Sequence, residues 1–338
     1  MINIILPTCN RPQMLKKALG SIDAQSARDR INTVLVSENG GNRESQGVCN
    51  EFPELPIHYV FRNPPLSPLE HARIMMSMHL RDDYTAILHD DDWWTPDHLA
   101  NACNALERNP DATSYYSGFF QISGESSLLH CDHNLSFWFG AGYPSFEPVW
   151  RLSHAAVTLA TLLCTPGQYS TLVARTEAFQ TASSIYFDYE NPFDNDRMLI
   201  LKLSLVGPVL FNPIPEVFIR QHPAQDMRSF PKLEQTKRML WTTRWIVENC
   251  SISFPELGNL FVDRFELCPA TARPMLLGHV IVPWCLPLLA VRADAPAALV
   301  ALYRRLRRPW KEILKKIIQT CIPPVLFNAM KSLIRFNA

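Results

Sequence analysis

The sequence lacks a long hydrophobic run. The longest, Val280–Val291, has 12 residues and two prolines, well short of the roughly 20 apolar residues that span a bilayer as a helix. Paired cysteines are missing too, because the nine cysteines are scattered, with no CxxC pair and no zinc-ligand spacing. An apolar run follows Met1 at once, without a secretory leader. These absences predict a protein of the reducing cytoplasm.

Net charge is also absent, since 32 basic residues balance 32 acidic ones in a chain of 338 residues. The balance is uneven, because residues 301–338 carry nine Lys and Arg against Glu312 alone. The rest of the chain is therefore acidic and would repel phosphates, so we expect no nucleic-acid partner. Apolar residues make up 47% and charged residues 19%, a composition typical of a folded protein.

What the sequence does contain is an alternation of apolar runs with helical patterns. Strands are predicted at residues 2–6, 31–36, 57–61 and 84–88, with helices from residue 12 and over 68–80. Further strands are predicted at 113–124, 209–211 and 217–219. Alternating strands and helices predict an open, mostly parallel α/β sheet. In such sheets ligands bind beyond the carboxyl ends of the strands.

Three consecutive carboxylates, Asp90, Asp91 and Asp92, follow the fourth predicted strand. Like charges repel, so a buried strand can hold them only at its open end and beside a cation. Hard ions such as Mg²⁺ or Mn²⁺ take oxygen ligands, and Mg²⁺ often completes its shell with phosphate oxygens. The cluster thus predicts a metal and a nucleoside diphosphate. The simpler alternative is a solvated turn before the next helix, near Thr95 or Asp97.

Four stretches carry a resemblance: LPTCNRPQMLKKALGSIDAQ, VLVSENGG, HAR and LHDDDWWTPDHL. In this order and spacing they resemble the family 2 glycosyltransferases, over roughly residues 2–222. The first and last stretches are specific, and the other two are weak alone. The resemblance implies the GT-A fold, a Rossmann-like sheet flanked by helices. It also implies a nucleotide-sugar donor, a divalent metal on an Asp-x-Asp motif, and inversion at the anomeric carbon.

Carried over residue by residue, the resemblance places Pro7, Thr8 and Arg11 in the nucleotide pocket. Glu38 falls where the family usually has an Asp that reads the base. A glutamate at this position can still accept hydrogen bonds from the base, but its side chain is one methylene longer than that of aspartate. The donor we expect is a UDP-sugar.

The metal motif can be aligned in two registers. In one, His89 replaces the first acid and Asp91 is the ligand. In the other, Asp90 and Asp92 are the two acids. Both registers stay open, so all three aspartates are candidate ligands of Mn²⁺ or Mg²⁺, and Asp90 is also a candidate donor contact.

Three further residues lie near the diphosphate or the metal by the same resemblance. Arg73 falls where the family often has an arginine near the diphosphate. Arg220 and His222 match an Arg-x-His that often ends the family's core, with His222 as a candidate metal ligand. The alternative for His222 is a surface or hydrogen-bonded histidine.

Sugar transfer needs a base that deprotonates the acceptor hydroxyl. Residues 187–197 precede a predicted helix, where a carboxylate stays ionised near the backbone N–H groups. The resemblance implies a Glu-Asp pair there, a basic residue six positions on and a glycine eleven on. Lys202 and Gly207 match these offsets for Asp196, with Asp194 as the runner-up. The alternative is that either aspartate merely caps the helix.

For domain organisation we expect a catalytic domain over residues 1–225. Residues 1–110 would bind the nucleotide sugar, 111–225 would bind the acceptor, and 226–338 would form a helical extension. In its tail, apolar residues line one helical face with lysines beside them: Trp310, Ile313, Leu314, Ile317, Ile318 and Cys321. Such a helix can lie on an anionic membrane, and the alternative is a helix docked on its own core.

Together these features predict an inverting, metal-dependent glycosyltransferase in cell-surface polysaccharide biosynthesis. Its acceptor would be a hydroxyl of a glycan or a lipid-linked saccharide. It would act in the cytoplasm or on the inner face of the cell membrane. The alternative, motivated by the departures at Glu38 and Asn195, is a catalytically silent nucleotide- or sugar-binding protein on the same fold.

Overall fold

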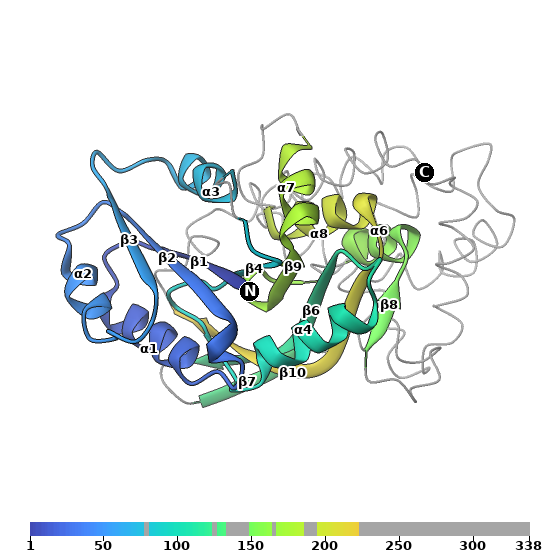
Figure 1. The fold of residues 1–338 in the computed structure, drawn as a ribbon, viewed down its shortest axis with the longest axis horizontal. Coiled ribbons are helices and arrows are strands. Elements are labelled where there is room, and N and C mark those ends of the chain that lie inside the picture. Colours follow the sequence, from blue (N-terminus) through green and yellow to red (C-terminus); the bar gives the residue numbers. More distant parts are fainter. Residues whose placement is uncertain (78–80, 124–126, 133–148, 164–166, 186–194, 223–338) are drawn as a thin grey trace, which may run out of the picture. The chain divides into compact units, whose positions relative to one another are not determined.

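A computed structural model describes residues 1–77, 81–123, 127–132, 149–163, 167–185 and 195–222 (Figure 1). The chain divides into two units, Met1–Cys250 and Ser251–Ala338, and every described residue belongs to the first. The predicted boundary at residue 225, the helical extension 226–338 and its membrane-facing tail lie outside the described residues and stay predictions. Within the described ranges, no helix combines the length and the apolar character needed to cross a membrane.

The first half of the sheet consists of four parallel strands: β1 (Ile2–Thr8), β2 (Ile31–Asn39), β3 (Ile57–Arg62) and β4 (Tyr84–Ile87). Their order is β3-β2-β1-β4. All four were predicted from short apolar-rich runs, and an apolar run like that of β1 is typical of a central parallel strand. Because the strands are parallel, their carboxyl ends, with the polar turns that follow, share one edge of the sheet.

Helices cover this half on both sides: α1 (Pro12–Asp23), α2 (Glu44–Cys49), α3 (Pro68–Met76) and α4 (His98–Arg108). Proline at the start of α1 fits a position whose N–H would lack an intrahelical partner. The helix buries Leu15, Ala18, Leu19 and Ile22, which lie at the spacing of one helical face. Helices α1 and α4 pack their apolar faces on the same core cluster.

The second half of the sheet is mixed. Strand β9 (Leu172–Arg175) lies antiparallel between β4 and β6 (Ser114–Ser123), and β10 (Val209–Gln221) runs parallel to β6. The strands predicted at 209–211 and 217–219 are one strand with an irregular register between Asn212 and Val217. The α/β architecture is thus as predicted, with a strand reversal that local patterns do not reveal.

Three short strands complete the sheet. β5 (Trp93–Trp94) and β8 (Trp150–Leu152) pair antiparallel with β10, and β7 (Ser127–Asp132) pairs with β6. Beyond them lie α6 (His154–Leu163), the 3₁₀ turn η2 (Tyr169–Thr171), α7 (Thr176–Ser184) and α8 (Asn195–Val206). In Figure 1, α7 and α8 are drawn in the upper half of the view and α1 and α4 in its lower half, with β10 below α4.

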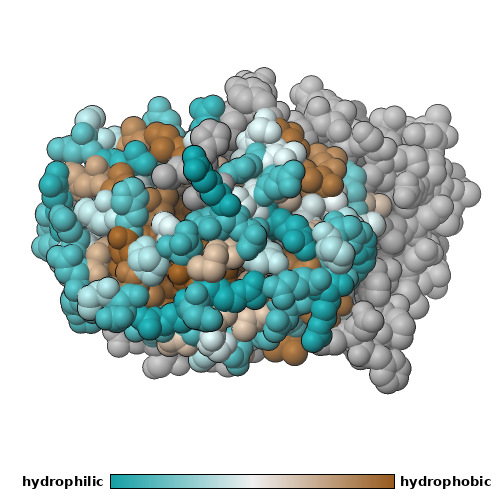
Figure 2. Space-filling model, in the orientation of Figure 1, coloured by the Kyte–Doolittle hydropathy of each residue, from teal (hydrophilic) through white to brown (hydrophobic). Residues whose placement is uncertain are grey.

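The described surface in Figure 2 is a mixture in which hydrophilic residues predominate. Large apolar side chains that are exposed come from the chain start, α3, α8 and β10: Met1, Ile74, Leu205, Val206 and Ile214. Isolated exposed apolar residues are ordinary on a folded protein. The informative features are therefore the polar groups that are buried, and several of these lie at the carboxyl edge of the sheet, among them Thr8, Glu38, Asp90 and Asp92.

Candidate active site

The three aspartates lie in a tight turn that is fixed at both ends. Before it, the Leu88 N–H donates to the Ile5 carbonyl at 3.0 Å and so extends the pairing of β4 with β1. Within it, the Asp92 N–H donates to the His89 carbonyl at 3.1 Å. After it, β5 pairs with β10. The turn (residues 89–92, here called the acidic turn) is therefore held between two hydrogen-bonded strands.

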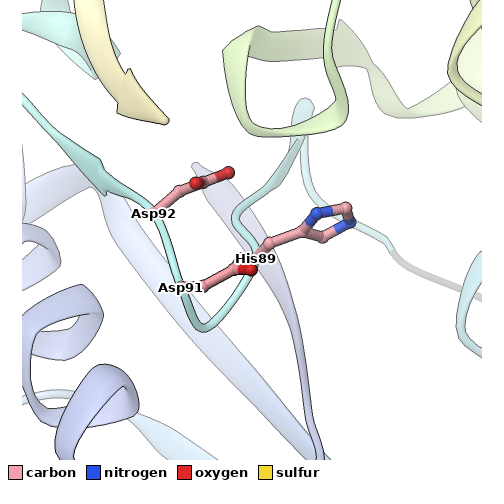
Figure 3. Close-up of side chains that lie close together, drawn as sticks. All are labelled: His89, Asp91 and Asp92. Carbon is pink, nitrogen blue, oxygen red and sulfur yellow. The ribbon is translucent and has the colours of Figure 1, made fainter. Parts of the chain in front are cut away.

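Three side chains of the acidic turn form a candidate metal site. Ligand atoms of His89, Asp91 and Asp92 all lie within 4.8 Å of one another, and Figure 3 shows them projecting from the turn toward the same side. Two carboxylates and an imidazole are ligands that Mn²⁺ or Mg²⁺ accepts. The geometry favours the register in which His89 replaces the first acid.

Asp92 is held by two donors. Its Oδ1 accepts from the Arg220 backbone N–H at 3.1 Å, and its Oδ2 accepts from the Ser170 hydroxyl at 2.5 Å. The same hydroxyl accepts from the His89 N–H at 3.2 Å. Burial, together with the charge of Asp91, raises the pKa of Asp92 to about 7. A bound cation would offset this penalty, because it favours the ionised carboxylate.

Asp90 has a different role from its neighbours. It is buried, and its Oδ2 accepts from the Thr8 hydroxyl at 2.7 Å while its Oδ1 accepts from Arg11 Nη1 at 3.1 Å. The same Nη1 lies 3.4 Å from Asp91 Oδ2. Burial, and then the charge of Asp91, raises the pKa of Asp90, which Arg11 and Thr8 oppose. Asp90 thus connects the acidic turn to Thr8 at the end of β1 and to Arg11 in the polar loop that follows. Pro7 lies just before Thr8, within the strand.

The end of β10 returns to the acidic turn. His222 Nε2 lies 2.9 Å from Asp91 Oδ2, and Arg220 Nε donates to the Asp91 carbonyl at 3.2 Å. The Arg220 guanidinium also lies over the Trp93 ring, 5.1 Å from its centroid. The structure therefore brings Arg220 and His222 to the aspartates from about 130 positions away in the sequence. Their contact with a diphosphate or a metal stays a prediction.

Glu38 lies at the same edge but beneath the surface. Its side chain is fully buried. Its Oε1 accepts from the Ser45 hydroxyl at 2.8 Å, and its Oε2 accepts from the Tyr59 hydroxyl. Burial and the hydrogen bond to Glu38 raise the pKa of Tyr59. Both carboxylate oxygens thus already have a protein donor, and the reading of the base by Glu38 stays a prediction.

The motif HAR (residues 71–73) lies on α3, and its histidine is buried while its arginine is exposed. Arg73 is exposed. The pKa of Glu70 is lowered by hydrogen bonds with Ser67 and by the nearby charge of Arg73. His71 is buried, with Nε2 2.8 Å from the Ser37 hydroxyl. The placement of Arg73 beside the diphosphate stays a prediction.

The candidate base Asp196 lies in the first turn of α8, and Asp194 lies outside the described residues. Burial alone would lower the pKa of His89, but the surrounding carboxylates raise it, with Asp196 among them. Asp196 is therefore within electrostatic reach of the acidic turn. Burial lowers the pKa of Lys202 to about 8. A Cβ on Gly207 would lie 2.9 Å from Thr113 Cγ2, so the chain after α8 closely approaches the residue that precedes β6.

Sequence reasoning missed Ser170, which bonds both Asp92 and His89. It lies in η2, just before β9, and its local sequence carries no motif. Its place follows from the antiparallel direction of β9, which brings the start of this strand beside the end of β4. A single sequence gives no signal for that pairing.

Residues 3–151 match the sequence model of a family described as glycosyl transferase family 2. No curated protein matches the chain. A solved structure of S. aureus TarS 1-349 in complex with UDP-GlcNAc is similar, with 13% identity and a TM-score of 0.60, over 92% of this chain and 91% of that one. TarS 1-349 in complex with UDP matches over the same shares, with 13% identity and a TM-score of 0.58.

At this identity the likeness to TarS shows the fold alone. The family match covers β1 to β8 and includes the acidic turn. Together these findings support a glycosyl transfer role. The fold is that of the GT-A glycosyltransferases, and residues 3–151 of the chain match the family 2 model.

Proposed function

We propose that this protein transfers a sugar, with inversion, from a nucleoside-diphosphate donor to a hydroxyl of a glycan or lipid-linked saccharide. One observation carries the proposal: ligand atoms of His89, Asp91 and Asp92 lie within 4.8 Å of one another, in the part of the chain that matches the family 2 model. A cation site and a base are what such a displacement needs. The match of residues 3–151 to the family 2 model supports the same reaction.

On the donor side, His89, Asp91 and Asp92 would hold Mn²⁺ or Mg²⁺. When bound, the cation neutralises the diphosphate leaving group. Asp90 holds Thr8 and Arg11 at the adjoining loop through hydrogen bonds of 2.7 and 3.1 Å. Arg11, Arg220 and Arg73 are the proposed cationic partners of the diphosphate, with Pro7 and Glu38 beside the nucleoside. His222 orients Asp91 and is the alternative ligand.

On the acceptor side, Asp196 takes the proton of the attacking hydroxyl. The new bond forms at the anomeric carbon as the bond to the diphosphate oxygen breaks on the opposite face, and the configuration inverts. A position in the first turn of α8 favours the ionised carboxylate. Asp194 is the alternative base.

The proposed setting is cell-surface polysaccharide synthesis, in the cytoplasm or at the inner face of the membrane. In this arrangement residues 1–110 bind the donor, 111–225 bind the acceptor, and 226–338 carry the basic tail. Flotation with anionic vesicles tests the tail. Vesicle binding that survives deletion of residues 309–338 would exclude it as the membrane anchor.

The reaction is tested with a panel of UDP-sugars and Mn²⁺, scored by release of UDP. UDP-sugars come first because TarS was solved with UDP-GlcNAc and with UDP. We expect turnover that chelation with EDTA removes and that Asp91→Asn reduces to background. The matched control is Asp97→Asn, a nearby exposed aspartate, which should retain activity. Equal activity in both variants would contradict the proposed site.

The second candidate is a catalytically silent nucleotide- or sugar-binding protein. One observation favours it: both oxygens of Glu38 are already bonded to Ser45 and Tyr59. This reading expects donor binding that is indifferent to metal, with no UDP released from any donor. Calorimetry with and without Mn²⁺, run beside the turnover assay, separates the two.

A further inference from the structure

Three aromatic side chains stack across β6, β10 and β5. Phe120 pairs with Phe218 across β6 and β10, and Phe218 pairs with Trp93 across β10 and β5. The rings of the first pair are stacked with centroids 4.9 Å apart, and those of the second pair with centroids 5.2 Å apart. Cross-strand aromatic pairs of this kind stabilise a sheet. The ring of Trp93, the residue directly after the acidic turn, is therefore held against its neighbour.

The indole of Trp93 also contacts two cations. Lys17 Nζ of α1 lies 3.4 Å from a ring centroid, and the guanidinium carbon of Arg220 lies 5.1 Å from one. A cation within about 6 Å of an aromatic ring is attracted by the negative face of the ring, and tryptophan attracts it most strongly. Arg220 is buried, and the attraction is larger at a desolvated site. Trp93 is therefore an electrostatic partner of Arg220.

Arg220 is bonded to the acidic turn by its side chain and by its backbone. Its Nε donates to the Asp91 carbonyl at 3.2 Å, and its backbone N–H donates to Asp92 Oδ1 at 3.1 Å. A single hydrogen bond leaves a long arginine side chain much of its rotational freedom, but a planar guanidinium also stacks on aromatic faces. The Trp93 ring and the Asp91 carbonyl together therefore fix where the guanidinium lies at the acidic turn.

We propose that Trp93 is a positioning residue for Arg220: its ring holds the guanidinium beside the acidic turn, where the diphosphate of the donor would bind. The inference rests on the proposed function and adds a residue to it. Trp93 acts through Arg220 and does not touch the reacting atoms. Ordering a flexible side chain costs affinity when a ligand binds, and a guanidinium that is already held has less freedom to lose.

The first test is Trp93→Leu, which keeps an apolar side chain on β5 and removes the ring. We expect the affinity for UDP with Mn²⁺, measured by calorimetry, to fall by about 3- to 30-fold, the range of a partly to fully desolvated cation–π contact. Trp93→Phe keeps a ring and should recover most of this affinity. Binding of Mn²⁺ alone, followed by electron paramagnetic resonance, should be unchanged, because the ligands of the acidic turn are all present.

Phe120→Leu is the matched control at the other end of the aromatic stack. It removes a stacked ring but leaves Trp93 and its contact with Arg220 in place, so we expect a lower thermal midpoint and the wild-type affinity for UDP. An equal loss of UDP affinity in both variants would overturn the inference, because the stack would then act through the stability of the sheet. Wild-type affinity in Trp93→Leu, or weaker binding of Mn²⁺ alone, would overturn it as well.

A double-mutant cycle tests the contact without any ligand. Trp93→Leu, Arg220→Met and the double variant are compared by urea unfolding. If the ring holds the guanidinium, the effects are non-additive by about 2- to 30-fold in the unfolding equilibrium constant, and additive effects would overturn the inference. The same cycle with Phe120→Leu in place of Trp93→Leu should be additive. If the wild type neither binds nor transfers a nucleotide sugar, the proposed function fails, and the cycle alone then decides whether Trp93 holds Arg220.

Discussion

Two buried acidic sites flank the short strand β5, and they are built differently. On one side, Glu216 accepts four hydrogen bonds: from Asn101 and Asn212 at 2.7 and 2.9 Å, and from Tyr115 and His98 at 2.8 and 3.1 Å. Its two oxygens offer about four acceptor positions, so this carboxylate is saturated by protein groups.

The acidic turn on the other side places three carboxylates together. Asp92 receives a hydroxyl and a backbone N–H, and Asp91 is shared between Arg11 and His222. Burial and mutual repulsion raise the pKa values of Asp90 and Asp92. A saturated buried carboxylate stabilises the fold, whereas crowded carboxylates with acceptor capacity left are suited to a cation. The comparison separates structural from functional acids in one small region.

The largest expected effect comes from Asp92→Asn. We expect transfer to fall by about 10²–10³-fold, because the variant weakens the charge that holds the cation against the leaving group. Without metal, the folded protein should become more stable at pH 7.5. The pKa of Asp92 is raised to about 7, so the native state binds this proton more tightly and loses stability as pH rises from about 4 to above 7. Kinetics and metal-free thermal melts measure both effects.

Glu216→Gln should give the reverse pattern. The new amide nitrogen would face other donors, and a buried network with unsatisfied donors costs about 2–4 kcal/mol. We expect the free energy of unfolding in urea to fall by that amount, with kcat of the folded protein within a few-fold of the wild type. Glu54→Gln, at an exposed site, is the control. A stable but inactive Glu216→Gln protein would break the comparison.

Ser170→Ala probes the shell around the acidic turn. The hydroxyl bonds Asp92 and the His89 backbone, and loss of such a supporting partner typically weakens metal affinity about 10- to 100-fold. We expect weaker Mn²⁺ binding by calorimetry in the presence of UDP. Ser184→Ala, an exposed serine on α7, should bind as the wild type. Unchanged affinity in Ser170→Ala would exclude it as a support of the ligand.

The smallest effect is expected at His71, a buried group that stays neutral. Burial and the charge of Arg62 lower its pKa to about 4. The Ser37 hydroxyl accepts from Arg62 Nε at 3.1 Å and so donates to His71 Nε2. Between pH 6.5 and 4 the unfolded chain binds a proton that the native state excludes, so stability falls as pH falls.

His71→Asn should remove this part of the acid sensitivity, on the order of 2 kcal/mol at pH 4 relative to pH 7. Urea unfolding at several pH values measures it. His58→Asn, at an exposed position, should keep the wild-type slope. The same slope in both variants would show that the His71–Ser37 pair does not set the pH dependence.

The sequence predicted the first half of the molecule well because its information is local. The apolar runs predicted β1 to β4. The polar turns that follow three of these strands lie at the carboxyl edge of the sheet, as parallel strands require. What could not be predicted depends on distant partners. The choice between metal registers needed the side-chain directions of His89 and Asp91. The burial of Glu38 needed Ser45 and Tyr59, and the role of Ser170 needed the reversal of β9.

That reversal has a consequence for how such a chain can diversify. A parallel strand places its last residue at the carboxyl edge of the sheet, but β9 places its first residue there, so η2, which precedes β9, lies at that edge as well. Residues added or deleted ahead of η2 would change the surroundings of the acidic turn, while the ladder from Leu172 to Arg175 kept its pairing with β4 and β6. The sequence of β9 must therefore be kept for the sheet to form, whereas the length of the chain ahead of η2 can vary.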